Sequence, residues 1–152
     1  MSLKTKIPPP AVAVVTALII WGISRLAPQV AMPSGVRLSV ALALVVMGVS
    51  LGAAGIISFR LGRTTVNPTK PEEASSLIST GIYRVTRNPM YLGILLALIA
   101  WAVFLSSAWA LFAAGGFVLY MNHFQIAPEE RALLELFSNE YKSYKARVRR
   151  WL

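Results

Sequence analysis

A short polar segment in the second half of the chain holds side chains that could do chemistry. Arg84, Arg87 and Asn88 lead into Pro89, where a long apolar run begins. Pro89 fits the first turn of a helix, where its missing N–H costs nothing. Asn88 then lies at or near the N-cap, where its side chain can satisfy a free backbone N–H. A helix N-terminus beside two arginines can bind a carboxylate; a capped helix start at a membrane surface is the alternative.

A second polar segment closes the same apolar run. Three polar residues, among them His123, are followed by Pro128, Glu129 and Glu130. Pro128 predicts an end or a kink in the helix, with both glutamates in the first turn of the next one. The glutamates could complement the helix dipole, or accept hydrogen bonds from ribose hydroxyls or an ammonium group. His123 has an intrinsic pKa suited to proton transfer; a hydrogen-bonded His at the membrane interface is the alternative.

Three uncharged runs locate the elements that must position these side chains: 7–24, 38–59 and 88–128. One membrane span needs about 20 residues, and the last run is about twice that length. It therefore predicts two crossings, which turn at Ser106-Ser107. We predict an all-α integral membrane protein with about four transmembrane helices, at about 8–25, 37–59, 90–105 and 108–126.

Spans three and four form a tight helical hairpin in this prediction. The hairpin returns the chain to the same membrane face, so the Arg-Asn-Pro-x-Tyr and Glu-Glu segments should be neighbours. A cytoplasmic loop at 60–89 and a cytoplasmic C-terminal segment at 128–152 complete a single membrane domain. Apolar residues at a spacing of three to four predict an amphipathic helix in the C-terminal segment: Leu133, Leu136, Phe137, Tyr141 and Tyr144.

The composition agrees with a membrane protein. Hydrophobic residues make up 56% of the 152 residues and charged residues only 14%, too little polar surface for a soluble domain of this size. The absence of cysteine excludes disulfide scaffolds, Cys-ligated zinc, iron–sulfur clusters and thiol catalysis. A single histidine leaves little from which to build a metal site, and we expect none.

The net charge of +9 is distributed unevenly. If four helices alternate, every basic residue except Arg25 and Arg37 falls on one side, and the positive-inside rule places both termini in the cytoplasm. Topology and anionic headgroups then explain the charge better than nucleic acid does. A proton-coupled exporter needs an ionisable group within the bundle, and the acidic residues all lie outside the spans.

Taken in order, the polar segments resemble the isoprenylcysteine carboxyl methyltransferase and phospholipid methyltransferase group of bacterial-type integral-membrane enzymes. The resemblance covers about residues 64–152. Asn88 stands where that group usually has His; Asn keeps a donor and an acceptor but cannot titrate. The matching motifs are Gly81-Ile82-Tyr83-Arg84, Arg87-Asn88-Pro89-Met90-Tyr91, Glu129-Glu130, Tyr141-Lys142-Ser143-Tyr144 and Arg150-Trp151.

The resemblance implies methyl transfer from S-adenosylmethionine, with S-adenosylhomocysteine as product. The cofactor would lie between spans three and four and the C-terminal segment, and a lipophilic acceptor would reach it from the bilayer. Carried over by position, the cofactor-binding residues are Tyr83, Arg87, Asn88, Pro89, Tyr91, Glu129 and Glu130. Catalytic candidates are Glu130, Arg131 and His123, and Arg147 and Arg149 could orient the acceptor.

Several questions stay open at the level of sequence. An isoprenylcysteine-type carboxylate, a lipid amine and a small thiol are all possible acceptors, and the oligomeric state is undetermined. We expect membrane lipid and a small lipophilic molecule as partners, with no nucleic acid, and a bacterial inner membrane as the location. The alternative function is a non-enzymatic membrane scaffold whose basic tail binds lipid or a protein partner.

Overall fold

The computed structural model describes residues 7–62 and 76–152, and all regular structure within these ranges is helical. Four of the basic residues behind the predicted orientation in the membrane lie outside the described residues: Lys4, Lys6, Arg63 and Lys70. The elements are, in order, α1 (Pro9–Leu26), α2 (Ser34–Leu61), the 3₁₀ turn η2 (Gly81–Arg84), α3 (Pro89–Phe104), α4 (Leu111–Tyr120), the π-helical turn η3 (Met121–Ile126) and α5 (Ala127–Arg147). The prediction of an all-α protein is confirmed.

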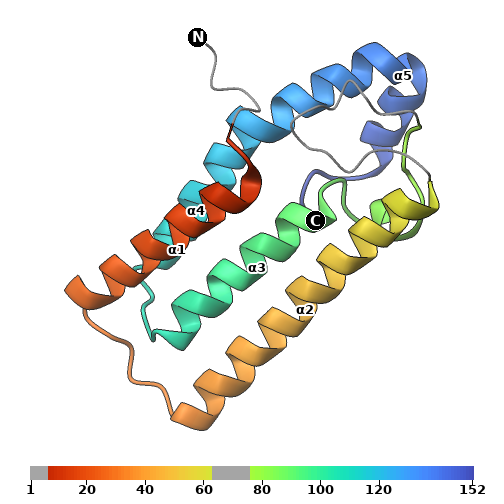
Figure 1. The fold of residues 1–152 in the computed structure, drawn as a ribbon. Helices are drawn as coiled ribbons and strands as arrows, with labels where there is room; N and C mark the ends of the chain where they lie inside the picture. The colour runs from red at the N-terminus through yellow and green to blue at the C-terminus, as the bar shows by residue number, and fades with distance from the viewer. Residues whose placement is uncertain (1–6, 63–75) are drawn as a thin grey trace.

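The four long segments run alternately up and down (Figure 1). α3 lies in the middle, with α2 on one side and α1 and α4 on the other. The end of α2, the start of α3 and the passage from α4 to α5 all meet at one end of the bundle. The hairpin expected from the sequence is therefore present, and it brings the two polar segments together.

The turn between α3 and α4 forms where Ser106-Ser107 predicts it. Ser106 adopts a positive φ of 54°, and its carbonyl accepts a hydrogen bond from the N–H of Val30 at 2.8 Å. Its hydroxyl accepts one from Nη1 of Arg37 at 3.3 Å. These bonds tie the connection between α1 and α2 to the hairpin turn and close the end of the bundle opposite the polar segments.

Two glycines allow α2 and α3 to approach closely. The buried residues of α2 are Ala41, Gly48 and Gly55, seven positions apart, so a single small-residue stripe faces α3. A Cβ atom on Gly93 of α3 would lie 2.5 Å from the carbonyl oxygen of Gly48. Such small-residue contacts allow helices to pack tightly in lipid, where no hydrophobic force drives them together.

Two helices, α1 and α2, are long and apolar enough to cross a membrane by length and composition. Their outward faces are apolar and exposed; Leu18, Leu42 and Val49 each expose more than half of their surface. α3 is apolar but shorter, at 16 residues. The number of spans therefore stays a prediction, while the exposed apolar surface suits a protein surrounded by lipid.

The sequence predicts an end or a kink in the helix at Pro128, and the structure shows that the helix does not end there. The backbone keeps helical angles at Tyr120, Ile126 and Ala127, so α4 continues through the π-helical turn into α5. A proline removes one donor and crowds the carbonyl four residues earlier. The wider π-helical turn that precedes Pro128 gives the ring room, and the helix passes through.

The sharp change of direction comes instead at Ser138, where φ is 37° and ψ is −109°. The kink folds the last part of α5 back over the polar end of the bundle (Figure 1). This brings Tyr141, Tyr144 and Lys145 to the polar segments.

Ser138→Gly should stabilise the protein. A side chain at positive φ costs about 1 kcal/mol or more, and glycine does not bear this cost. We expect the free energy of unfolding to rise by about 1 kcal/mol, measured by denaturant titration in detergent. Ser143→Gly makes the same change in a regular turn of α5 and should lower it. Equal losses in both variants would contradict the strained kink.

Candidate functional site

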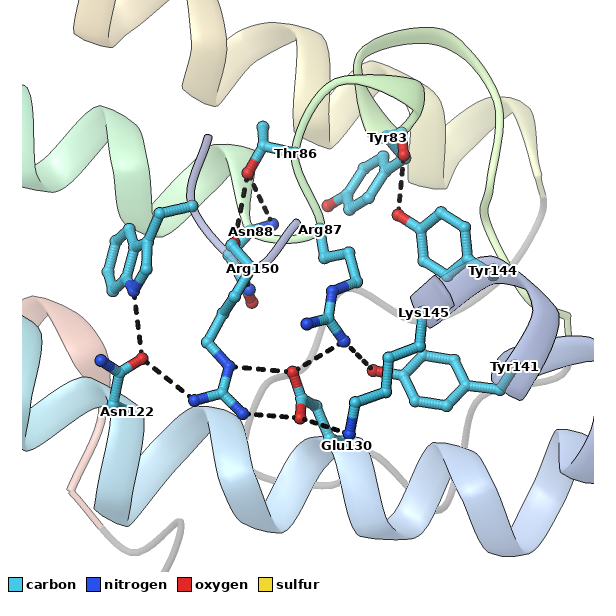
Figure 2. Close-up of polar contacts among 11 residues, drawn as sticks. Tyr83, Thr86, Arg87, Asn88, Asn122, Glu130, Tyr141, Tyr144, Lys145 and Arg150 are labelled. Carbon is cyan, nitrogen blue, oxygen red and sulfur yellow. Dashed lines mark hydrogen bonds and ion pairs between the residues drawn. The ribbon is translucent and has the colours of Figure 1, made fainter. Parts of the chain in front are cut away.

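Glu130, in the first turn of α5, lies at the centre of a cluster of positive charges (Figure 2). Arg150 donates to both of its carboxylate oxygens, through Nε at 3.0 Å and Nη2 at 2.7 Å. Nη1 of Arg87 lies 2.9 Å from Oε1, and Nζ of Lys145 lies 3.4 Å from Oε2. Both oxygens are therefore engaged by cations supplied from three separate parts of the chain.

The cations keep Glu130 ionised although it is buried. Burial alone would raise the pKa of its carboxyl, but the hydrogen bonds from Arg150 and the charges of Arg87 and Lys145 outweigh burial and lower the pKa below its ordinary value. The side chains of Glu130 and Arg87 are only 8% and 9% exposed. We call Glu130, Arg87, Arg150 and Lys145 the cation cluster.

Glu129 points to a different set of partners. Its Oε1 accepts hydrogen bonds from the hydroxyl of Tyr91, at 2.6 Å, and from Nε2 of Gln125, also at 2.6 Å. Neighbouring residues on a helix are rotated by about 100° from each other, which is why the two glutamates face different partners. Burial raises the pKa of Glu129 to about 7, against the hydrogen bonds from Tyr91 and Gln125 that lower it.

The raised pKa of Glu129 predicts a dependence of stability on pH. The folded state holds a proton that the unfolded state has already lost, so stability is fully present below pH 4.5 and is lost as the pH rises towards about 7. The loss can reach about 1.4 kcal/mol for each pH unit. Unfolding measured between pH 4.5 and 8 should show this decline in the wild type and not in Glu129→Gln.

The C-terminal residues Arg149–Trp151 form a strap across the start of α3. The backbone N–H of Arg87 donates to the carbonyl of Arg149 at 3.0 Å. The carbonyl of Arg150 accepts from the hydroxyl of Thr86 at 3.3 Å and from Nδ2 of Asn88 at 2.8 Å. The strap is thereby joined to the polar segment that precedes α3.

The side chain of Asn88 does not cap α3 as the sequence suggested. Asn88 is the N-cap residue by position, but its side chain makes no capping bond. Its amide donates to the strap instead, and its own backbone N–H donates to the hydroxyl of Thr86 at 3.2 Å. Pro89 does occupy the first turn of α3, as predicted.

Three tyrosines pack beside the cation cluster. Tyr144 donates to the carbonyl of Tyr83 at 2.8 Å, and Nη1 of Arg87 donates to the hydroxyl of Tyr141 at 3.4 Å (Figure 2). The ring of Tyr83 meets Phe59 of α2 edge to face, with centroids 5.5 Å apart. All three tyrosines are buried, so they fix η2 against the folded-back end of α5.

Two of the predicted catalytic residues lie outside this network. His123 is exposed and its ring meets Phe124 edge to face, with centroids 4.7 Å apart. Arg131 is exposed on α5. Neither makes a hydrogen bond or ion pair with any residue that the structure describes. Arg147 donates through Nε to the carbonyl of Ser143 in its own helix. The other predicted residues, Tyr83, Arg87, Asn88, Pro89, Tyr91, Glu129 and Glu130, are brought together.

Sequence reasoning missed several members of the site. Asn122 and Gln125 carried a signal, because they are polar residues at the end of an otherwise apolar run. Tyr141 and Arg150 belong to the motifs of the resemblance but had been given no role. No sequence pattern indicates a role for Lys145, because its contact with Glu130 depends on the kink at Ser138.

An all-helical bundle with two long apolar helices and a cluster of charges at one end suits a membrane protein. The chain belongs to the phospholipid methyltransferase family, which matches residues 36–140. The family and the two long apolar helices make it a membrane protein of a methyltransferase family.

Two relatives are similar to shorter stretches of the chain. A protein named only as uncharacterized, from Haemophilus influenzae, is 48% identical over 63 residues, which are 41% of this chain and 100% of that protein. Methanethiol S-methyltransferase 1 of Bradyrhizobium diazoefficiens is 40% identical over 67 residues, 44% of this chain but only 22% of that enzyme. No solved structure matches the chain.

Proposed function

We propose that this protein transfers a methyl group from S-adenosylmethionine to a lipophilic acceptor at the membrane surface. The observation that carries the proposal is that Arg87 binds Glu130 while the adjacent Glu129 binds Tyr91 at the same end of the hairpin, inside a chain of a methyltransferase family. The arrangement offers positive and negative groups within one site, as a cofactor that bears a carboxylate, an ammonium group and ribose hydroxyls requires.

Two polar atoms support the fit of this cofactor. Nε of Arg87 is buried and has no hydrogen-bond partner among the described residues, and a guanidinium binds carboxylates well. Both bonds to Glu129 go to Oε1, and no described residue donates to Oε2. In the proposal Arg87 holds the carboxylate of the cofactor, and Glu129 accepts from its ammonium group or ribose.

In the proposal, the remaining residues of the site act on the cofactor through Arg87 and Glu129. Glu130 fixes Arg87, and Asn88 fixes the strap that carries Arg150. Tyr91 orients Glu129 through its hydroxyl, and Tyr83 closes the site from the side of η2 in the proposal.

When bound, the cofactor supplies an activated methyl group that a nucleophile takes by direct displacement. The protein then has to align the two reactants and exclude water. In the proposal, four buried tyrosines form a side of the site that excludes water: Tyr83, Tyr91, Tyr141 and Tyr144. A carboxylate acceptor needs no base, whereas a thiol or an ammonium group must first lose its proton. The acceptor belongs to one of these three classes.

The polar end of the bundle faces the cytoplasm in this proposal. Among the described basic residues, only Arg25 and Arg37 lie at the opposite end, beside the connection between α1 and α2. The positive-inside rule then places both termini in the cytoplasm, with a bacterial inner membrane as the expected location.

Thermal unfolding of the detergent-purified protein with S-adenosylhomocysteine tests the proposal. A ligand at about 100 times its dissociation constant stabilises the native state by about 2.7 kcal/mol. We expect this shift in the wild type and its loss in Glu129→Gln and Tyr91→Phe. Glu140→Gln makes the same change of charge at an exposed position of α5 and should keep the shift. A well-folded wild type that shows no shift would refute the proposal.

A lipid-binding scaffold is the second candidate. A surface pocket of about 230 Å³ is lined by Ser79, Arg84, Tyr144, Arg147 and Val148, and its two arginines could bind a phosphate headgroup. This function predicts that binding to vesicles containing phosphatidylglycerol is lost in the Arg84→Gln, Arg147→Gln variant, and that S-adenosylhomocysteine does not stabilise the protein.

A further inference from the structure

The π-helical turn Met121–Ile126 joins α4 to α5 and carries polar side chains into the site. Such turns insert a residue into a helix and often lie at functional sites. Asn122 and Gln125 come from this turn, and Gln125 already supports Glu129. Asn122 is directed towards a different part of the site, the strap (Figure 2).

Asn122 accepts two hydrogen bonds from the strap through one atom. Its Oδ1 lies 3.0 Å from Nε1 of Trp151 and 3.4 Å from Nη1 of Arg150. Trp151 also packs against the central apolar cluster of the bundle. Asn122 therefore ties the two ends of the polar site together, the π-helical turn on one side and the chain's C-terminal residues on the other.

These bonds continue as a chain of contacts to Arg87. Arg150 is held by Asn122 at Nη1 and binds Glu130 through its other two nitrogens. Glu130 in turn binds Nη1 of Arg87 at 2.9 Å. The carbonyl of Arg150 is fixed from the other side by Asn88. Without Asn122, Arg150 would keep its two bonds to Glu130 but lose the bond from Nη1, and Trp151 would lose its own hydrogen-bond partner.

We propose that Asn122 is a positioning residue that locks the strap and thereby holds Arg87 in place for the anionic group of the ligand. The inference rests on the proposed function, because the ligand is the cofactor named there. Asn122 acts through Arg150 and Glu130 and does not touch the ligand. Its role requires only the acceptor oxygen Oδ1, since both bonds end on that atom.

This requirement predicts opposite results for two substitutions. Asn122→Ala removes the acceptor, and we expect the dissociation constant of S-adenosylhomocysteine to rise about 10-fold or more, as for other groups that orient a binding residue. Asn122→Asp keeps an oxygen at the same place beside Arg150 and should bind with wild-type affinity. Asn139→Ala and Asn139→Asp make the same changes at an exposed position of α5 and should change nothing.

The experiment measures two quantities on the full chain in detergent. Titration calorimetry gives the dissociation constant of S-adenosylhomocysteine, and limited trypsin digestion with mass spectrometry gives the rate of cleavage after Arg149 and Arg150. Asn122→Ala should weaken binding and speed this cleavage, and Asn122→Asp should restore both. If Asn122→Ala does not fold, Trp151→Phe removes one donor while keeping a ring against the bundle, and it should move both quantities in the same direction.

The outcomes separate this inference from the proposed function. If the wild type binds and Asn122→Ala speeds cleavage without weakening binding, the strap is merely structural and the inference is wrong. If Asn122→Asp is as weak as Asn122→Ala, the amide nitrogen matters and the inference is also wrong. If the wild type itself does not bind, the proposed function fails, and the inference about the ligand fails with it.

Discussion

Glu130→Gln should lower the free energy of unfolding by about 3 kcal/mol. The substitution removes the negative charge that Arg87, Arg150 and Lys145 surround. Arg87 is then left buried without a counter-charge, and breaking a buried pair in this way costs about 3–5 kcal/mol. The lower part of this range applies because Arg150 and Lys145 are partly exposed and screened by solvent, and because Gln keeps one acceptor oxygen.

Unfolding in detergent, followed by circular dichroism, measures this loss. Glu135→Gln makes the same substitution at an exposed position of α5 and should change stability by less than about 0.5 kcal/mol. Equal stability of the two variants would show that the cation cluster contributes nothing to folding. Because the pKa of Glu130 is lowered, the wild type should lose the same contribution as the pH falls below about 4.5.

Gly93→Ala should also lower the free energy of unfolding substantially. The new Cβ atom would lie 2.5 Å from the carbonyl oxygen of Gly48 and 3.3 Å from the backbone nitrogen of Gly52. Both contacts are to backbone atoms, which cannot rotate away, so α2 and α3 must separate. Forcing an extra group into a packed contact costs about 1–3 kcal/mol, and in this bundle the separation disturbs the largest helix–helix contact.

Gly115→Ala provides the control, because a Cβ atom there would meet nothing within 4 Å. Alanine favours a helix over glycine by about 1 kcal/mol, so Gly115→Ala should stabilise the protein while Gly93→Ala destabilises it. Gly93 lies half a turn from Tyr91, so the displaced α3 should also weaken the binding of S-adenosylhomocysteine. If the two alanine variants have equal stability, the close contact between α2 and α3 is not essential.

The sequence alone determined the helices and the hairpin, because these depend on local physics. Uncharged runs of about 20 residues form helices in lipid, where no other backbone partner exists. Pro89 marks the start of α3 through its fixed φ, and Ser106-Ser107 marks the turn. Once the hairpin is known, its geometry brings the segment before α3 and the Glu129–Glu130 pair to one end. The sequence therefore predicted which segments of the chain meet at the candidate site.

Only the tertiary structure decided which partner each of these residues binds. Asn88 and Arg150 are 62 positions apart, and no local pattern indicates that the amide of Asn88 binds the carbonyl of Arg150 and leaves α3 uncapped. Two adjacent glutamates look equivalent in the sequence, but the rotation of about 100° between neighbours on a helix directs Glu130 to the cations and Glu129 to Tyr91. The π-helical turn and the kink at Ser138 complete the site, because they bring Asn122 and Lys145 to partners that exist only after the helices have packed.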